Sequence, residues 1–386
     1  MTSYERVKAA VEHREADKVP FDLGGSVLTG INRKAYVNLR AYLGLPEAVV
    51  SIVDEMQQLA RPDADFLRKI EVDVACIDPD GPSTPGLATR STRDGEYLRM
   101  NDEWGIEWRM PVDNGLYYDM TGHPLATVDS IAALDAYPWP DPADPARFAT
   151  LKARADKAVF QDKQAYILGR QYAGIWETAL WMSGFEKFFT DMMVEKDYAH
   201  ALMDKITELK MIYWEKALAA VGDNVLIISE ADDLATQNSL LCSPQLYKEM
   251  VHPYHKKLFS FIKSKAPHKV HIFYHTCGAV KPLIPYLIEE GVDILNPVQV
   301  NADGMDSRLL KKEFGKDMTF WGGGVDTQHV LPFGTPAEVR DEVKRRIDDF
   351  APGGGFVFAA VHNVQGDVPP ENFMAMREAL ADFGVY

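Results

Sequence analysis

Cysteine is scarce in this chain of 386 residues, which contains only Cys76, Cys242 and Cys277. An odd and sparse set of thiols excludes a disulfide framework and is typical of a reducing compartment. Long apolar runs are also lacking: the first residues form a charged amphipathic pattern rather than a signal peptide, and no later stretch is apolar enough to span a bilayer. We therefore expect a cytoplasmic protein that has no membrane as a partner.

Positive charge is the second shortage, since 41 lysines and arginines stand against 57 acidic residues and give a net charge of −16. This balance repels the phosphates of nucleic acids and anionic lipids, so no nucleic-acid partner is expected. Hydrophobic residues, by contrast, make up 46% of the chain, and charged residues make up 25%. These proportions are typical of a globular chain that buries a sizeable core.

Eight short apolar runs rich in β-forming residues begin at Val19, Val74, Ala165, Asn224, Lys269, Val292, Met318 and Gly355. Stretches with helical spacing separate most of them, and Ser243 and Thr335 each precede a proline, as a helix N-cap often does. This alternation predicts an α/β fold, and a count of eight favours a (β/α)8 TIM-like barrel forming a single domain over residues 1–386. A dinucleotide-binding open sheet is disfavoured, because the glycines of GGSVLTG after the first run have the wrong spacing.

One segment, about residues 84–127, interrupts the alternation of strands and helices. Its period-2 runs EYLRM and GIEWRM are separated by the turn-forming residues Asn101 and Asp102. The segment therefore predicts a β-meander inserted after the second strand of the barrel.

Polar residues follow the predicted strands, and the active site of a barrel lies at the carboxyl ends of its strands. His275 and Cys277 are two positions apart where the fifth run ends, so an extended backbone directs both side chains to one side. His362 follows the eighth run. Imidazole and thiolate ligands suit zinc, and three protein ligands leave a fourth position open, as in catalytic zinc sites. An H-x-C pair also arises by chance, but its position at a strand end favours a metal site formed by His275, Cys277 and His362.

Further polar residues occupy the same predicted edge. Glu230, with Asp232 and Asp233, is a candidate fourth ligand or general base, or alternatively caps the following helix. The other strand-end candidates are Asp22, Arg170, Asn296, Gln299, Asp326 and Asn363. Tyr172 belongs to a group of aromatic residues, most of which core packing explains, although an aromatic wall over the barrel mouth would suit a planar ligand.

Six segments carry a resemblance to a known family: ERVKAAVEHREADKVPFD, SPQLYKEMVHPYHKKL, YHTCGAV, GVDILNPVQ, FWGGGVDTQHVLPFGTPAEV and VPPENFMAM. Together they resemble the uroporphyrinogen decarboxylase superfamily over essentially the whole chain. In its corrinoid (cobalamin)-dependent methyltransferase branch, the His and Cys of an H-x-C-G motif bind zinc, and here these are His275 and Cys277. The third zinc cysteine of the coenzyme M methyltransferases precedes the Glu of a P-x-E-N motif by nine positions, and counting back from Glu371 gives His362.

This replacement keeps a zinc ligand but sets the chain apart from enzymes that use coenzyme M as the acceptor. The chain looks most like the substrate-side methyltransferases of O-demethylation. The decarboxylases of the superfamily carry an Arg-rich R-Q-A-G-R segment after the first strand, where this chain has FDLGGSVLTG with Asp22 and no arginine before Arg33. An acidic mouth repels a porphyrinogen with many carboxylates.

The resemblance implies a zinc-dependent methyltransferase that passes a methyl group from a methoxylated, aromatic small molecule to the cob(I)alamin of a separate corrinoid protein. With it we expect catalytic roles for Glu230, Asp326 and Gln299, and substrate binding by Asp22, Arg170, Tyr172, Asn296 and Asn363. Two alternatives stay open: a metal-free decarboxylase on the same barrel, and a non-catalytic tetrapyrrole- or corrinoid-binding protein. Formation of a homodimer also stays open.

Overall fold

A parallel sheet of seven strands is the centre of the computed structural model, which describes residues 1–386. Its order in space is β14-β13-β12-β11-β10-β9-β4, so the strands follow one another around the sheet as they do along the chain. Their bounds are β4 (Val74–Ile77), β9 (Ala165–Leu168), β10 (Ile227–Ala231), β11 (His271–His275), β12 (Ile294–Asn296), β13 (Thr319–Trp321) and β14 (Phe356–Val357). Sequential parallel strands separated by helices are the arrangement of a TIM-like barrel, which confirms the predicted fold class.

The first apolar run does not form a regular strand, although it lies where the first strand of a barrel belongs. The backbone N–H of Asp22 donates to the carbonyl of Phe358 at 2.9 Å, just beyond β14, and the N–H of Asp73, just before β4, donates to the carbonyl of Phe21 at 2.8 Å. The run thus lies between the two end strands of the sheet. It ends early because Gly24 has a φ of +81°, which turns the chain out of the extended conformation.

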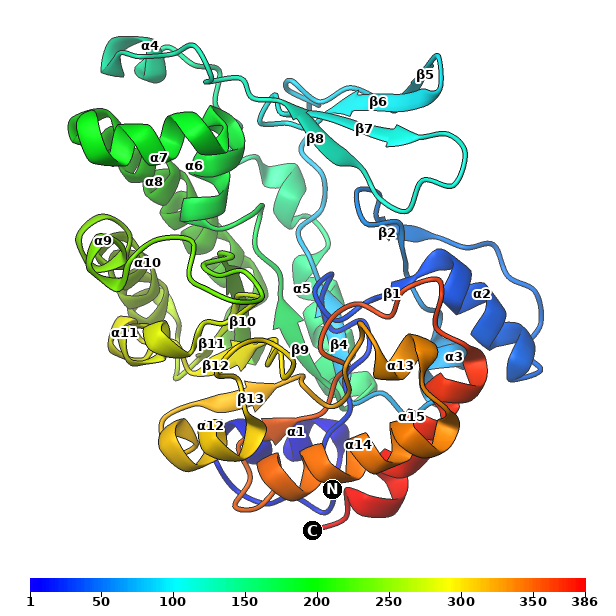
Figure 1. Ribbon diagram of the computed structural model, residues 1–386. Coiled ribbons are helices and arrows are strands. Elements are labelled where there is room, and N and C mark those ends of the chain that lie inside the picture. The colour runs from blue at the N-terminus through cyan, green and yellow to red at the C-terminus, as the bar shows by residue number, and fades with distance from the viewer.

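Helices connect the strands and cover the outside of the sheet (Figure 1). The N-caps expected at Ser243 and Thr335 are confirmed, since each hydroxyl accepts a backbone N–H of the first turn and Thr335 forms a capping box with Glu338. The helices are α1 (Ser3–Val11), α2 (Arg33–Tyr42), α3 (Ala64–Lys69), α4 (Ile131–Asp135), α5 (Leu151–Asp156), α6 (Ile175–Ser183), α7 (Phe185–Val194), α8 (Lys196–Val221), α9 (Pro244–Met250), α10 (His252–Lys265), α11 (Ile284–Glu290), α12 (Ser307–Phe314), α13 (Val330–Phe333), α14 (Pro336–Phe350) and α15 (Pro370–Phe383).

The predicted β-meander is a four-stranded antiparallel sheet after β4, in the order β5-β6-β7-β8. Its strands are β5 (Thr92–Asp94), β6 (Tyr97–Asn101), β7 (Glu107–Pro111) and β8 (Asp119–Gly122). A second small sheet, β1-β3-β2, is formed by β1 (Ile31–Asn32), β2 (Ile52–Asp54) and β3 (Leu59–Ala60). Figure 1 shows the meander, in cyan, above one end of the barrel and away from both chain termini.

Two groups of buried side chains stabilise this arrangement. The larger one lies between strands and helices and also includes Trp104 and Trp108 of the meander region, so insertion and barrel share a core. The smaller one contains inward-facing strand residues such as Phe273 and Trp321, together with Val7 of α1. No helix combines the length and the apolar character needed to cross a membrane.

Candidate metal site and substrate cavity

Three predicted ligands from two separate strand ends converge at the rim of the barrel. His275 is the last residue of β11, Cys277 follows two positions later, and His362 lies beyond β14. One ligand atom from each of the three lies within 4.8 Å of the others, and the sulfur of Cys277 is 3.5 Å from Nε2 of His275. Gly278, with a φ of +88°, then turns the chain away from the rim. The structure therefore brings together residues that are far apart in the sequence.

The imidazole of His275 is held in one orientation by Asn296. The side-chain N–H of Asn296 donates to the carbonyl of Trp321 at 2.9 Å, so its oxygen faces Nδ1 of His275 at 2.6 Å. Nδ1 must then carry the proton, which leaves the lone pair of Nε2 directed toward Cys277. Burial lowers the pKa of His275 to about 4 and that of His362 to about 4, so both rings are neutral and able to bind a metal near pH 7.

The turn that carries Cys277 is fixed by two side chains from neighbouring strand ends. The backbone N–H of Cys277 donates to Asp233 at 2.8 Å, and that of Gly278 donates to Gln299 at 2.7 Å. Burial and the nearby Asp233 carboxylate hold the pKa of the Cys277 thiol well above its usual range. Binding of a cation to this sulfur would therefore release a proton.

Glu230 does not belong to this cluster, and the predicted ligand or catalytic role is wrong for a geometric reason. In the β10–β11 register Ala231 lies opposite His275, so Glu230, one position earlier, faces the other side of the sheet. There its carboxylate accepts from Lys210 at 2.9 Å and from the indole N–H of Trp214 at 2.5 Å, both on α8. Glu230 and Lys210 therefore form a buried structural ion pair.

Asp232 and Asp233 follow the same alternation. Asp232 accepts the backbone N–H groups of Ile175, Trp176 and Glu177 in the first turn of α6, and it pairs with His255 at 2.7 Å. Asp233 points to the opposite side and reaches Cys277.

Four other predicted residues use their polar groups within the protein, and none of them lines the cavity described below. Asp22 accepts from the indole of Trp321 at 2.8 Å, and burial raises the pKa of Asp22 to about 6. Asn363 accepts from the N–H of Gly30, while Asp326 accepts from the N–H of Gln328 within its own loop. Gln299 holds the turn at Gly278. The structure thus shows positioning contacts within the protein for these four residues, and the substrate-binding roles of Asp22 and Asn363 and the catalytic roles of Asp326 and Gln299 stay predictions.

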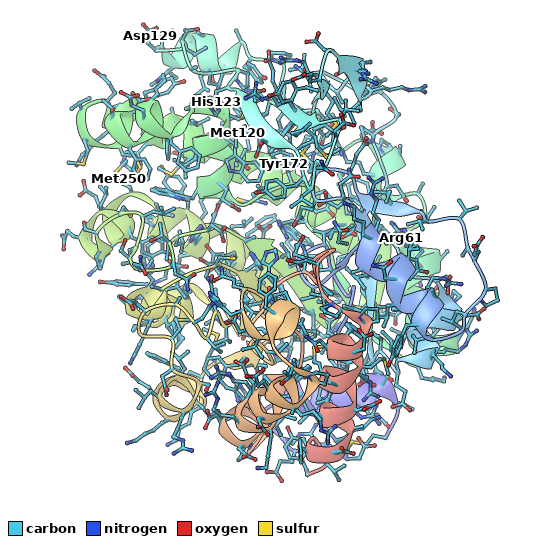
Figure 2. The ribbon with its side chains drawn as sticks, turned by 45° about the vertical axis from the view of Figure 1, so that its right-hand side comes forward. Arg61, Met120, His123, Asp129, Tyr172 and Met250 are labelled. Atoms are coloured by element: carbon cyan, nitrogen blue, oxygen red, sulfur yellow. The ribbon has the colours of Figure 1, made fainter.

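A cavity of about 730 Å³ extends from His362 to the underside of the meander. Arg170 and Tyr172, the two predicted substrate-binding residues that follow β9, both line it. The meander region contributes Trp108, Tyr117, Tyr118, Asp119 and Met120. Figure 2 labels Tyr172 and Met120 in this region between the meander and the barrel.

Glu177 is a residue near the site that the sequence did not single out. It lies in the first turn of α6, and burial, followed by the charges of Asp233 and Asp232, raises its pKa well above the usual range. In the sequence it has only the signature of an acidic residue at a helix N-terminus, a position that many helices share.

Comparisons with known proteins identify the family and agree with the fold. The family model described as uroporphyrinogen decarboxylase (URO-D) matches residues 115–383. The methylated-thiol–coenzyme M methyltransferase of Methanosarcina mazei is 27% identical over 201 residues, which is 52% of this chain and 49% of that protein, so the match spans about half of that relative. The uroporphyrinogen decarboxylase of Salmonella newport is 25% identical over 275 residues, covering 69% and 73% of the two chains. A solved methyltransferase from Methanosarcina mazei has the same fold, with a TM-score of 0.65, 20% identity and 99% coverage of both chains.

Proposed function

The chain belongs to the uroporphyrinogen decarboxylase family, and within it we propose that this protein is a zinc-dependent methyltransferase of the O-demethylase type. Its substrate would be a methoxylated aromatic compound, and its acceptor the reduced cobalt of a corrinoid carried by a separate protein. The observation that carries the proposal is the convergence of His275, Cys277 and His362 at the edge of the cavity.

The donor set fits a catalytic zinc ion. Two imidazole nitrogens and one sulfur are ligands that zinc prefers, and three protein ligands leave a position for substrate. His362 lines the cavity, so a bound substrate reaches this side of the ligand set. Bound zinc would act as a Lewis acid on the ether oxygen and so favour departure of the demethylated product as an oxyanion.

The protein's own contribution is to hold the ligands and enclose the substrate. Asn296 fixes the tautomer of His275, while Asp233 and Gln299 fix the turn after β11. The meander covers the cavity and reduces contact of the reacting groups with water. One relative is named a methylated-thiol–coenzyme M methyltransferase, and this name supports methyl transfer as the reaction class.

A porphyrinogen decarboxylase is the second candidate on this fold, and the charges of the cavity disfavour it. Arg170 is the only lysine or arginine that lines the cavity, against the three carboxylates of Asp54, Asp78 and Asp119. A substrate with many carboxylates would meet a net negative wall.

Metal analysis with a pair of cysteine variants tests the proposal. We expect the purified protein to hold about one zinc per chain and to transfer methyl groups from methoxylated aromatics to cob(I)alamin, because its three ligands form one site. Cys277→Ala should lose both metal and activity. Cys242→Ala is the matched control, since Cys242 is another free cysteine outside the ligand set and should leave both unchanged. Full activity after stoichiometric removal of zinc would reject the proposal.

A further inference from the structure

Arg170 is a cation of the cavity that forms no ion pair, although its charge acts on the nearby buried Glu177, whose pKa is raised by burial well above the usual range. It follows β9, and Nη1 donates to the hydroxyl of Ser229 on β10 at 3.2 Å. Its Nε is buried and has no hydrogen-bond partner, and no carboxylate lies within ion-pair distance of the guanidinium. Buried donors of this kind are normally satisfied, and a guanidinium favours a carboxylate as its acceptor. The unused donor therefore points to an anionic ligand.

The neighbouring wall of the cavity is aromatic, and the polar atoms of Trp108 and Tyr172 in it are already occupied. The indole N–H of Trp108 donates to Oδ2 of Asp102 at 2.9 Å, and the hydroxyl of Tyr172 donates to the same oxygen. Trp181 lies edge-to-face with both rings, at centroid distances of 5.7 Å and 5.8 Å. Because Asp102 binds the polar tips, ring carbons rather than polar groups of Trp108 and Tyr172 are left to contact a ligand.

Asp102 thus joins two parts of the chain. It lies between β6 and β7 of the meander, whereas Tyr172 belongs to the loop after β9, which also carries Arg170. The backbone N–H groups of Trp104 and Ile106 also donate to this carboxylate. One buried side chain therefore places the aromatic wall beside the guanidinium.

We propose that the cavity takes an aromatic monocarboxylate as its substrate. The carboxylate would bind Arg170 and the Ser229 hydroxyl. The ring would lie against Trp108, Tyr172 and Trp181. A single anionic group is favoured because Arg170 is the only lysine or arginine in the cavity, so a second carboxylate would have no cation to bind.

The inference rests on the proposed function for the reaction that the substrate undergoes, but the binding of an aromatic anion can be measured without turnover. Calorimetric titration of the full chain with benzoate, benzyl alcohol and benzene-1,3-dicarboxylate separates the charge from the ring. We expect benzoate to bind at least about tenfold more tightly than the neutral alcohol and the dicarboxylate, as a charge-assisted hydrogen bond in a partly buried site would give.

Arg170→Gln should weaken benzoate binding by at least about tenfold and leave benzyl alcohol within about twofold, while Arg170→Lys should retain part of the preference for the anion. Arg61→Gln is the matched control: Arg61, labelled in Figure 2, also lacks an ion pair but lines a separate groove and not this cavity. Equal binding of benzoate and benzyl alcohol to the unmodified protein overturns the inference, and this comparison requires no variant to fold. Unchanged benzoate affinity in Arg170→Gln overturns it as well.

A methyl-transfer assay separates this inference from the proposed function. If benzoate binds through Arg170 but neither methoxybenzoate nor methoxybenzene donates a methyl group to cob(I)alamin, the proposed reaction fails and the anion site stands. If methoxybenzene is a donor and methoxybenzoate is not, the reaction stands and the anion site is wrong.

Discussion

Replacing Asn296 by alanine tests whether a side chain outside the proposed ligand set controls metal affinity. The variant removes the oxygen that accepts from Nδ1 of His275 at 2.6 Å and the N–H that binds the carbonyl of Trp321 at 2.9 Å. Loss of such a partner from a ligating histidine typically costs 10–100-fold in metal affinity. We therefore expect zinc to bind about 10–100-fold more weakly, which corresponds to about 1.4–2.7 kcal/mol.

The same substitution also destabilises the fold, so the two effects must be separated. Two buried hydrogen bonds are lost, and at about 0.5–1.5 kcal/mol each the free energy of unfolding of the metal-free protein should fall by about 1–3 kcal/mol. Asn372→Ala is the matched control. Asn372 is also a buried asparagine, and its amide donates to the carbonyls of Leu331 and Gly334 at 2.9 Å and 2.8 Å, remote from the ligands.

Competition with a chelator of known affinity measures zinc binding, and urea unfolding of the metal-free protein measures stability. Both variants should lose similar stability, but only Asn296→Ala should lose zinc affinity. Equal zinc affinities for the two variants would show that the amide does not orient His275, and the assigned tautomer would then be wrong.

The remaining predictions concern the networks around the site. Burial alone would lower the pKa of His255, but Glu290 and Asp232 raise it to about 10, above the reference value of 6.5. The protonated ring therefore stabilises the fold fully below about pH 6.5 and loses this effect as the pH rises toward 10, so the free energy of unfolding should decrease over that range. His255→Gln should flatten this dependence of the free energy of unfolding on pH. Equal slopes for the variant and the unmodified protein would contradict the assignment. Asp102→Ala leaves four donors without their acceptor and should lower the free energy of unfolding, measured in urea, by more than about 3 kcal/mol. Asp119→Ala, at an exposed position of β8, is the control and should change this free energy by less than about 0.5 kcal/mol. Similar losses in the two variants would contradict the structural role given to Asp102.

Much of the barrel could be predicted because its strands are buried on both faces. Such strands appear as short apolar runs, and the runs beginning at Val74 and Lys269 contain β4 and β11. The carboxyl ends of parallel strands meet at one rim, so the order of the runs was sufficient to predict that His275 and His362 converge. The first run was overestimated as a strand because Gly24 ends its extended conformation, and a glycine does not reveal its φ in the sequence.

Contacts between the meander and the barrel were beyond the reach of sequence patterns. Asp102 and Tyr172 are 70 positions apart and belong to two different sheets or their loops. Period-2 alternation predicts the strands of the meander but not where the meander docks, because docking depends on side-chain packing in three dimensions. For the same reason Asp102 appeared only as a turn residue, and the absence of an ion pair at Arg170 could not be foreseen.

The acidic residues after β10 show how one position decides between structure and chemistry. All three side chains, those of Glu230, Asp232 and Asp233, are carboxylates, so each can bind a metal or hold a proton. The alternation of side chains along the strand sends Glu230 to Lys210 on α8 and continues in the loop, where Asp232 reaches the start of α6 and Asp233 reaches Cys277. A shift of one residue in the register would reverse these assignments. The sequence therefore identifies the rim at which the acids gather, while the register with β11 determines which of them faces the proposed metal.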